Sequence, residues 1–247
     1  YEPLLELLRH GSVSLKERQL LAQKAFQHVA SYDTAVAQYL RRGEEGFPAE
    51  LTLALKKHSD LRYGENPHQL AAFYVEDSPL GTRGSPGLGQ AQLLSGRELS
   101  FNNILDLDSA LVVVRAYTAP TVAIIKHNNP CGLASHERLV EAYRRALAGD
   151  PVSAFGGVVA LNRPLDVETA QEIDKTHYDC LLAPQFDPQA LALLSRKKDL
   201  RLVRLERVSV GQNAQELDFR RVVGGFLAQT RDVIQGSELA PRTVTQR

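Results

Sequence analysis

Apolar residues recur with a helical period in the first part of the chain. The Ser14-Leu-Lys-Glu17 sequence has capping-box spacing, in which a serine begins a helix and a glutamate three residues later completes the cap. From Leu20 the apolar positions keep near-helical spacing to about Tyr39. The run Arg41–Pro48 contains Gly and Pro and breaks this pattern. We therefore predict a long helix and a linker, with a domain boundary that separates residues 1–57 from residues 58–247.

After the boundary the pattern changes to short apolar strands that alternate with helices. The predicted strands lie at residues 70–75, 121–125, 180–184, 200–205 and 219–227, and one more follows the Gly156-Gly157 turn within residues 153–161. Helices are predicted at residues 135–148 and 166–175. Another leads from the 100–108 segment through residue 114. A fourth begins at Asp187, with proline at its first position. Residues 78–90 are rich in Gly, Pro and Ser and predict a surface loop. The alternation indicates an α/β fold with a mixed or mostly parallel sheet.

The strand at Thr121–Ile125 leads into the segment where chemistry is most expected. Lys126 and His127 follow it, and then the turn-forming residues Asn-Asn-Pro-Cys-Gly132. Ligands of open α/β sheets bind at strand ends, and a cation beside an imidazole suits proton transfer near a developing negative charge. Neighbours on a strand face opposite ways, so the two side chains cooperate only where the chain leaves strand geometry. We expect the Pro and Gly that follow to supply that departure. The simpler interpretation is that a buried run merely reaches water there.

Two other segments offer groups for ligand binding. In Leu61–Gln69, Gly and Asn-Pro force a turn that gathers Arg62 and Tyr63 with further polar residues. Arginine suits bidentate recognition of phosphate or carboxylate, although an ordinary polar loop has the same composition. The glycine turn at Gly156 lets backbone N–H groups meet a ligand, and a plain β-turn is its alternative. An asparagine at the entrance of the 100–114 helix is a good N-cap.

Composition narrows the classes of function. Twenty-nine basic residues balance twenty-nine acidic ones, so no overall field favours nucleic acid or a membrane surface. No apolar run approaches a membrane span, and the first residues given lack the apolar segment of a signal peptide. Two cysteines, Cys131 and Cys180, fit a reducing compartment, so we expect a cytoplasmic protein. The chain contains no methionine, and we expect it to be a segment of something longer.

Several chemistries lack their motifs. The Pro-Cys pair at Cys131 is similar to that of zinc deaminases, but Gly, Leu and Ala134 follow where a second cysteine is needed. No His-x-Glu or Cys-x-Glu occurs, so we expect no zinc. The chain also has no Walker loop and no Gly-x-Ser-x-Gly elbow. The Gly-rich segment 84–89 resembles a linker more than a dinucleotide fingerprint.

Four motifs, taken in order, resemble one known family. They are Leu61-Arg-Tyr-Gly-Glu-Asn-Pro-His-Gln69, Ser100-Phe-Asn-Asn-Ile-Leu-Asp-Leu-Asp108, Ile125-Lys-His-Asn-Asn-Pro-Cys-Gly132 and Ser153-Ala-Phe-Gly-Gly-Val-Val-Ala160. Together they closely resemble the bifunctional purine-biosynthesis family that carries AICAR formyltransferase and IMP cyclohydrolase. The resemblance covers nearly the whole chain. It implies that residues 1–57 are the C-terminal helical tail of the cyclohydrolase domain, and residues 58–247 the first part of the formyltransferase domain. The implied fold is a cytidine-deaminase-like mixed sheet with flanking helices, without zinc.

The resemblance also implies a reaction and a set of site residues. The reaction is transfer of a formyl group from 10-formyltetrahydrofolate to the 5-amino group of AICAR, and the parent protein also cyclises the product to IMP. His127 would be the base and Lys126 would stabilise the oxyanion. The expected nucleotide ligands are Arg62, Tyr63, Gly156 and Asp179. Asn103 would reach the nucleotide of the partner subunit, since the family's sites form across a homodimer.

The chain departs from the family pattern at both ends. The second half of the formyltransferase domain would follow residue 247, and most of the cyclohydrolase domain would precede residue 1. We therefore expect the 247-residue chain to be inactive alone. The alternative is a non-catalytic nucleotide-binding or dimerisation module of the same fold.

Overall fold

The computed structural model describes residues 2–9, 11–41, 43, 46–76, 87–206, 208 and 216–232. The described residues group into two compact units, one drawn from residues 1–59 and 74–84 and the other from residues 60–73 and 85–247. Most of the predicted loop at residues 78–90 lies outside the described residues, and Leu88–Gln90 at its end forms a short 3-10 helix, η1.

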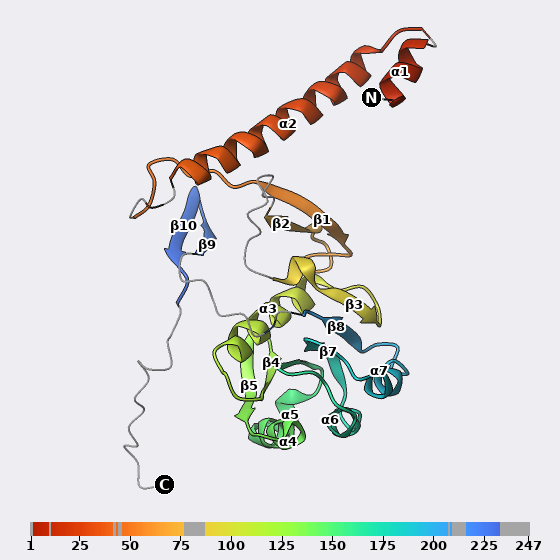
Figure 1. Ribbon diagram of the computed structural model, residues 1–247, viewed down its shortest axis with the longest axis vertical. Coiled ribbons are helices and arrows are strands. Elements are labelled where there is room, and N and C mark those ends of the chain that lie inside the picture. The colour runs from red at the N-terminus through yellow and green to blue at the C-terminus, as the bar shows by residue number, and fades with distance from the viewer. Residues whose placement is uncertain are drawn as a thin grey trace. The chain divides into compact units, whose positions relative to one another are not determined.

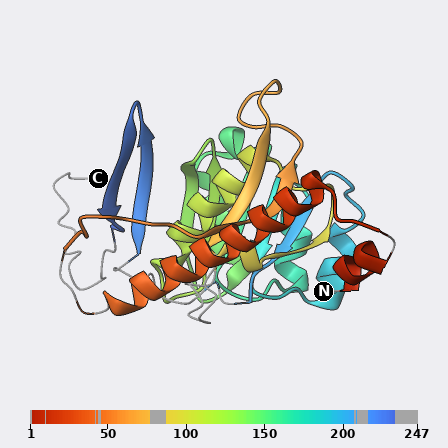
Figure 2. The same cartoon turned by 90° about the horizontal axis from the view of Figure 1, so that it is seen from above.

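The first unit is dominated by one long helix. A short helix α1 (Glu2–Arg9) precedes α2 (Leu15–Leu40), which runs unbroken in Figure 2. Ser14 Oγ accepts a hydrogen bond from the Glu17 backbone N–H at 3.3 Å, and the Glu17 carboxylate accepts one from the Ser14 N–H at 2.7 Å. This reciprocal pair confirms the predicted capping box. The backbone N–H groups of Ser14 and Glu17, which have no acceptor within the helix, each donate to a side-chain oxygen.

Two strands follow the helix along the chain. β1 (Leu55–Leu61) pairs with β2 (Ala71–Glu76) as a two-stranded sheet. β2 lies where the sequence predicted a strand. β1 was not predicted, because its sequence Leu-Lys-Lys-His-Ser-Asp-Leu has no alternation of apolar and polar positions. Propensity alone therefore gave no signal for the strand that precedes the Arg62 loop.

A six-stranded mixed sheet forms the centre of the second unit, as expected for the α/β class (Figure 1). The strand order is β3-β8-β7-β6-β4-β5. The strands are β3 (Gln92–Ser95), β4 (Thr121–Lys126), β5 (Asn129–Ser135), β6 (Gly157–Leu161), β7 (Tyr178–Ala183) and β8 (Arg201–Arg204). β6, β7 and β8 run parallel, whereas β4 is antiparallel to both β5 and β6. The carboxyl end of β4 and the amino ends of β6 and β7 consequently lie together. They form one edge of the sheet, and this edge is made of strand ends and not of an outermost strand.

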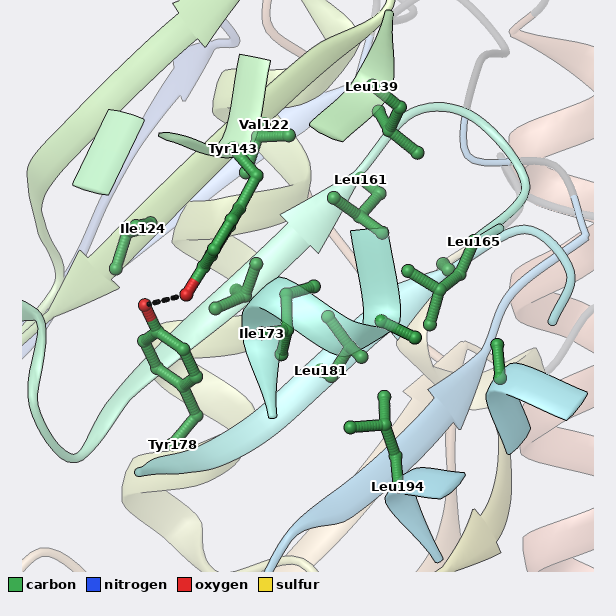
Figure 3. Close-up of a cluster of buried hydrophobic side chains, with 14 of the residues drawn as sticks. Val122, Ile124, Leu139, Tyr143, Leu161, Leu165, Ile173, Tyr178, Leu181 and Leu194 are labelled. Carbon is green, nitrogen blue, oxygen red and sulfur yellow. Dashed lines mark hydrogen bonds between the residues drawn. The ribbon is translucent and has the colours of Figure 1, made fainter. Parts of the chain in front are cut away.

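Helices cover both faces of this sheet. The helices are α3 (Phe101–Arg115), α4 (Leu139–Gly149), α5 (Pro151–Ala154), α6 (Val167–Ile173) and α7 (Pro188–Leu194). Alternate residues of β4 point to opposite sides, so that Val122 and Ile124 meet α4 to α7 while Ala123 and Ile125 meet α3. Figure 3 shows the first of these cores, in which the hydroxyls of Tyr143 and Tyr178 lie 3.0 Å apart in a buried hydrogen bond. That bond satisfies both polar tips in an otherwise apolar layer.

Three predicted elements are corrected by the structure. Asn129–Ser135 is strand β5 rather than a loop, so α4 begins at Leu139 and not at residue 135. Residues 219–227 are not one strand but parts of two, β9 (Leu217–Val222) and β10 (Gly225–Thr230), which pair as an antiparallel hairpin (Figure 2). Between them Gly224 has a φ of 83°, a conformation that glycine adopts without strain. The third is the cap of α3, which is Ser100 and not an asparagine.

The carboxyl group of Asp108 on α3 gives a prediction for stability. Asp108 keeps contact with solvent, but the atoms crowded around it withdraw much of its hydration and raise its pKa, against the attraction of Arg231 and Arg115. A raised pKa in the folded state means that stability falls as pH rises through that pKa. Asp108→Asn mimics the protonated form, so we expect it to raise the urea midpoint of unfolding at neutral pH. The gain should disappear near the ordinary carboxyl pKa of 3.8. An equal gain at both pH values would contradict this account.

Candidate functional site

A two-residue turn, His127-Asn128, joins β4 to β5 at this edge of the sheet. Because both of its residues have left-handed backbone conformations, it is called the reversed turn. His127 and Asn128 both have positive φ, 52° and 62°, and Lys126 pairs with Asn129 across the hairpin. Two successive left-handed residues are the mark of the turn that best fits the twist of a β-hairpin. For a residue other than glycine this conformation costs about 1–2 kcal/mol. The turn therefore needs stabilising contacts, and it leaves the His127 side chain exposed at its tip.

The contacts that hold the turn come from helix α3. The Asn128 backbone N–H donates to Asp106 Oδ1 at 2.8 Å. With its amide oriented so that both ends find partners, Asn128 Nδ2 also lies 3.2 Å from Asp106 Oδ1 and 3.3 Å from the Leu105 carbonyl oxygen. On the other side, Asn129 Nδ2 donates to the His127 carbonyl oxygen at 2.8 Å. Every residue of the turn is thus tied to a neighbour by its backbone.

Lys126 is the last residue of β4 and its side chain runs along the sheet edge. It is half-buried, and its Nζ donates to the Phe155 carbonyl oxygen at 2.7 Å. Phe155 follows α5, whose N-cap is Asp150. The Lys126 ammonium group is therefore held at the beginning of β6, one strand away from the His127 turn along the same edge. The chain leaves strand geometry at His127 and Asn128, and not at the Pro and Gly that follow, because both of those lie within β5.

Gly156 and Asp179 lie at the same edge as Lys126. Gly156 has a φ of 72°, and its N–H donates to the His177 carbonyl oxygen at 2.8 Å. Asp179 is the extra residue of a bulge, because Gly157 pairs with Tyr178 and Val158 already pairs with Cys180. Bulges of this kind redirect a side chain beside active sites. The structure thus brings together Lys126, His127, Gly156 and Asp179, which lie far apart in the sequence.

Phe155 and His177 were not singled out from the sequence. Their rings lie 5.1 Å apart at 36°, and His177 Nε2 is 3.9 Å from Asp179 Oδ1. Both side chains are exposed. Phe155 stands within the quoted glycine-turn motif, so it could have been considered. His177 carried no signal, because its place beside Phe155 depends on the parallel pairing of β6 with β7.

Asn103 helps to cap helix α3, but it is not the N-cap residue itself. The N-cap of α3 is Ser100, not an asparagine, and Asn103 completes a capping box. Its Oδ1 accepts from the Ser100 N–H at 3.1 Å, and only 6% of the residue is exposed. The predicted asparagine cap is therefore wrong, although an asparagine does take part in capping. The carboxamide oxygen of Asn103 is engaged at the helix start.

Arg62 and Tyr63 begin the loop between β1 and β2. Arg62 is exposed and Tyr63 is half-buried. The loop closes on itself through the Gly64 N–H, which donates to the Gln69 carbonyl oxygen at 2.9 Å. This closed form agrees with the turn that was predicted from Gly and Asn-Pro. It fixes the backbone immediately after the two predicted ligands.

The loop, the start of α3 and the reversed turn line one hollow of about 250 Å³. Its lining residues are Glu65, Asn102, Leu105, Asp106, His127 and Asn128. The hollow offers carboxylate, amide and imidazole groups within one small space. Glu65 and Asp106 both lie inside motifs quoted above, but their position beside His127 depends on contacts across more than 20 residues. Sequence alone could not reveal that contact.

Cys131, in the motif at residues 125–132, does not have the surroundings of a reactive cysteine. Cys131 Sγ donates to the Ile124 carbonyl oxygen at 3.4 Å, and burial raises the pKa of the thiol. A raised pKa keeps sulfur in the thiol form, whereas nucleophiles and metal ligands need the thiolate. Among the described residues, no group of three or more His, Cys, Asp or Glu side chains is placed to hold a metal ion. Nor does any described helix have the length and apolar character of a membrane span.

These features define a mixed α/β protein whose polar site lies at one edge of the sheet, beside a reversed hairpin turn. The chain matches the family described as the AICARFT/IMPCHase bienzyme over residues 1–247, and it belongs to that family. It is 41% identical over 247 residues to the bifunctional purine biosynthesis protein PurH of Pediococcus pentosaceus, covering 100% of this chain and 47% of that protein. It is 46% identical over 237 residues to PurH of Myxococcus xanthus, covering 94% of this chain and 46% of that protein.

The chain thus spans about half the length of the curated relatives that it matches. Among solved structures, RibD of Acinetobacter baumannii aligns with 42% of this chain and 35% of its own, at 13% identity and a TM-score of 0.31. That likeness is too slight to add to the fold described above.

Proposed function

We propose that the chain carries the first half of an AICAR formyltransferase site, within a protein that serves purine biosynthesis. The observation that carries the proposal is the exposed His127 on a turn that follows Lys126, in a chain that matches the bienzyme family throughout. The reaction transfers a formyl group from 10-formyltetrahydrofolate to the 5-amino group of AICAR. We place it in the cytoplasm, and the full-length protein would also cyclise formyl-AICAR to IMP.

His127 would take a proton from the attacking amine. That amine is a weak nucleophile, because its lone pair is conjugated with the imidazole carboxamide ring. As the amine nitrogen bonds to the formyl carbon, it must lose a proton to the base. The bond from that carbon to the folate nitrogen then breaks as the folate nitrogen takes up a proton, which the protonated His127 would return. A base held at the amine accelerates such a step by roughly 10²–10⁴-fold, the usual contribution of a general base.

Lys126 would stabilise the oxyanion that forms on the formyl oxygen. Its ammonium group already donates to a carbonyl oxygen at 2.7 Å, so its position is set before any substrate arrives. A positive group fixed in advance stabilises developing charge without reorganisation. In this role Lys126 would share its hydrogen bonds between the Phe155 carbonyl and the transferred group, which is open to a group with three donors.

The nucleotide would be bound along the edge of the sheet. Arg62 suits the phosphate, and Asp179 on its bulge would accept hydrogen bonds from the ligand. Gly156 would let the base approach its backbone closely and would offer its carbonyl oxygen, since its N–H already donates to the His177 carbonyl oxygen. Tyr63 would contribute its ring beside Arg62. We also propose a homodimer in which Asn103 reaches the partner's nucleotide, with its Nδ2 as the donor, since its Oδ1 caps α3.

A non-catalytic nucleotide-binding or dimerisation module is the second candidate. The extensive exposed apolar surface of α2, which includes Leu20, Phe26 and Tyr39, favours a role in assembly for residues 1–57. Under either candidate we propose that this tail packs within the cyclohydrolase domain and contributes no group to formyl transfer. The two candidates differ in turnover and not in fold.

The test compares the full-length protein with the 247-residue chain in a formyl-transfer assay with AICAR and 10-formyltetrahydrofolate. We expect turnover by the full-length protein and none by the chain alone, because further ligands would come from the absent half of the domain. Calorimetry with AICAR on both proteins separates binding from chemistry. Binding without turnover by the full-length protein would favour the module, and normal turnover by the chain alone would contradict the half-site.

A further inference from the structure

We propose that Asp106 is a positioning residue of this site, whose carboxylate fixes the reversed turn and thereby the place of the His127 imidazole. The inference rests on the proposed function for its kinetic consequence. Its structural part, that Asp106 holds the turn, stands on geometry alone. The family resemblance assigned roles to seven residues of the chain, and Asp106 was not among them.

The hydrogen bond from Asn128 to Asp106 joins two elements that are distant in sequence. The donor is the backbone N–H of the second left-handed residue, and the acceptor is Oδ1 at 2.8 Å. Hydrogen bonds with a charged acceptor are stronger than neutral ones. The bond therefore acts on one of the two residues with positive φ, and it stabilises the conformation that presents His127.

The helix that carries Asp106 is itself well anchored. Four α3 residues on the face toward the sheet are 2% exposed or less, namely Leu107, Ala110, Leu111 and Val114. They pack against Ala123 and Ile125 of β4, the strand that leads into the turn. The carboxylate thus spans from a fixed helix to the tip of a hairpin whose strand is packed on that same helix. A site supported in this way holds its geometry without help from the substrate.

The contact is with the backbone of the turn rather than with the imidazole ring. In the described part of the chain, Asp106 receives the Asn128 backbone N–H and approaches the Asn128 amide. His127 shares the hollow with Asp106 but is held through the chain. Asp106 therefore acts through Asn128 and is a positioning residue, not a catalytic one.

The experiment uses three variants of the full-length protein. Asp106→Leu removes the acceptor and keeps a side chain of similar size. Asp106→Asn removes the charge and keeps Oδ1 as an acceptor. Asp108→Asn is the matched control, because it removes one negative charge from the same helix, and the hydrogen bonds between α3 and the turn in the described part of the chain are made by Leu105, Asp106 and Ser109. Steady-state kinetics give kcat and KM for AICAR, and hydrogen exchange with mass spectrometry follows the peptide that contains residues 121–132.

We expect Asp106→Leu to lower kcat by about 10–100-fold, the usual effect of losing a supporting contact, with KM changed by less than about threefold. Asp106→Asn should recover most of that loss, and Asp108→Asn should leave kcat unchanged. Exchange in the 121–132 peptide should rise in Asp106→Leu alone, with the α3 peptides unaltered.

Other results overturn the inference or separate it from the proposed function. Unchanged kcat and exchange in Asp106→Leu would mean that Asp106 does not position the turn. Raised exchange throughout α3 would show a general structural role. Equal loss of kcat in the Leu and Asn variants, without added exchange at the turn, would make Asp106 a direct participant. If the wild-type protein transfers no formyl group but Asp106→Leu still loosens the turn, the proposed function fails and the positioning contact stands.

Discussion

Replacing His127 by asparagine is expected to lower kcat for formyl transfer by roughly 10²–10⁴-fold, the contribution of a general base. Asparagine is chosen because it has no imidazole ring and, among residues other than glycine, readily adopts positive φ. The conformation with a φ of 52° is therefore retained. The loss then reports the missing proton acceptor and not a collapsed turn. KM for AICAR should change little, since the imidazole is assigned to the chemical step rather than to the nucleotide. The measurement is a steady-state assay of the full-length protein.

His136→Ala is the matched control for that experiment. His136 follows β5 at the end where Ser135 pairs with Thr121, which is the opposite end of the hairpin from His127. Its ring accepts a hydrogen bond from the Arg138 N–H, a local contact at the start of α4. We expect kcat within about twofold of the wild type, in keeping with the small effect of most substitutions away from the site. Activity of His127→Asn within tenfold of wild type would instead favour the non-catalytic module.

Sequence predicted those parts of the fold that depend on short-range patterns. The capping box at Ser14 and the Asp187-Pro188 helix start both form as expected, because a cap needs only residues within one turn of helix. The strand at Thr121–Lys126 was evident because all but its last residue are buried, which makes the run continuously apolar. These signals are local, and each is satisfied almost regardless of the surrounding chain.

The hairpin at the site was missed for the opposite reason. β5 has the sequence Asn-Pro-Cys-Gly-Leu-Ala-Ser, whose first residues favour turns, and it is a strand because β4 offers it an edge to pair with. The proline and glycine were taken to end the strand geometry, whereas the reversal occurs earlier, at His127 and Asn128. Positive φ at two residues other than glycine is not readable from composition. It depends on Asp106, a side chain 22 residues away.

The candidate site shows the same division. Lys126, His127 and Gly156 were predicted from motifs and Asp179 from the family resemblance. The sheet places all four at one edge, but which groups surround them follows from strand order. Phe155 and His177 meet because β6 and β7 are parallel neighbours. A strand order that includes a crossover cannot be derived from residue patterns along the chain. The residues that support a site are therefore harder to predict than those inside its motifs.

Gly132 shows how a glycine in a motif can have a packing role that its sequence context hides. The sequence indicated a turn residue, yet Gly132 lies buried inside β5, opposite Ile124. A Cβ atom at this position would stand 2.2 Å from the Ala146 carbonyl oxygen and 2.8 Å from its carbon. Both atoms belong to the backbone of α4, so no side-chain rotation relieves the overlap. The close approach of α4 to β5 requires glycine.

Gly132→Ala is consequently expected to lower the free energy of unfolding by at least about 3 kcal/mol, the upper range for overpacking, because strand and helix must separate. Native-state hydrogen exchange should show this as roughly 100-fold faster exchange in peptides of β5 and α4. Gly225→Ala is the control, since nothing lies within 4 Å of its added Cβ. It should change stability by less than about 0.5 kcal/mol, as surface substitutions usually do. If Gly132→Ala were as mild as Gly225→Ala, the backbone of α4 would not be held against β5. The packing that carries the strand beside the His127 turn would then be looser than described.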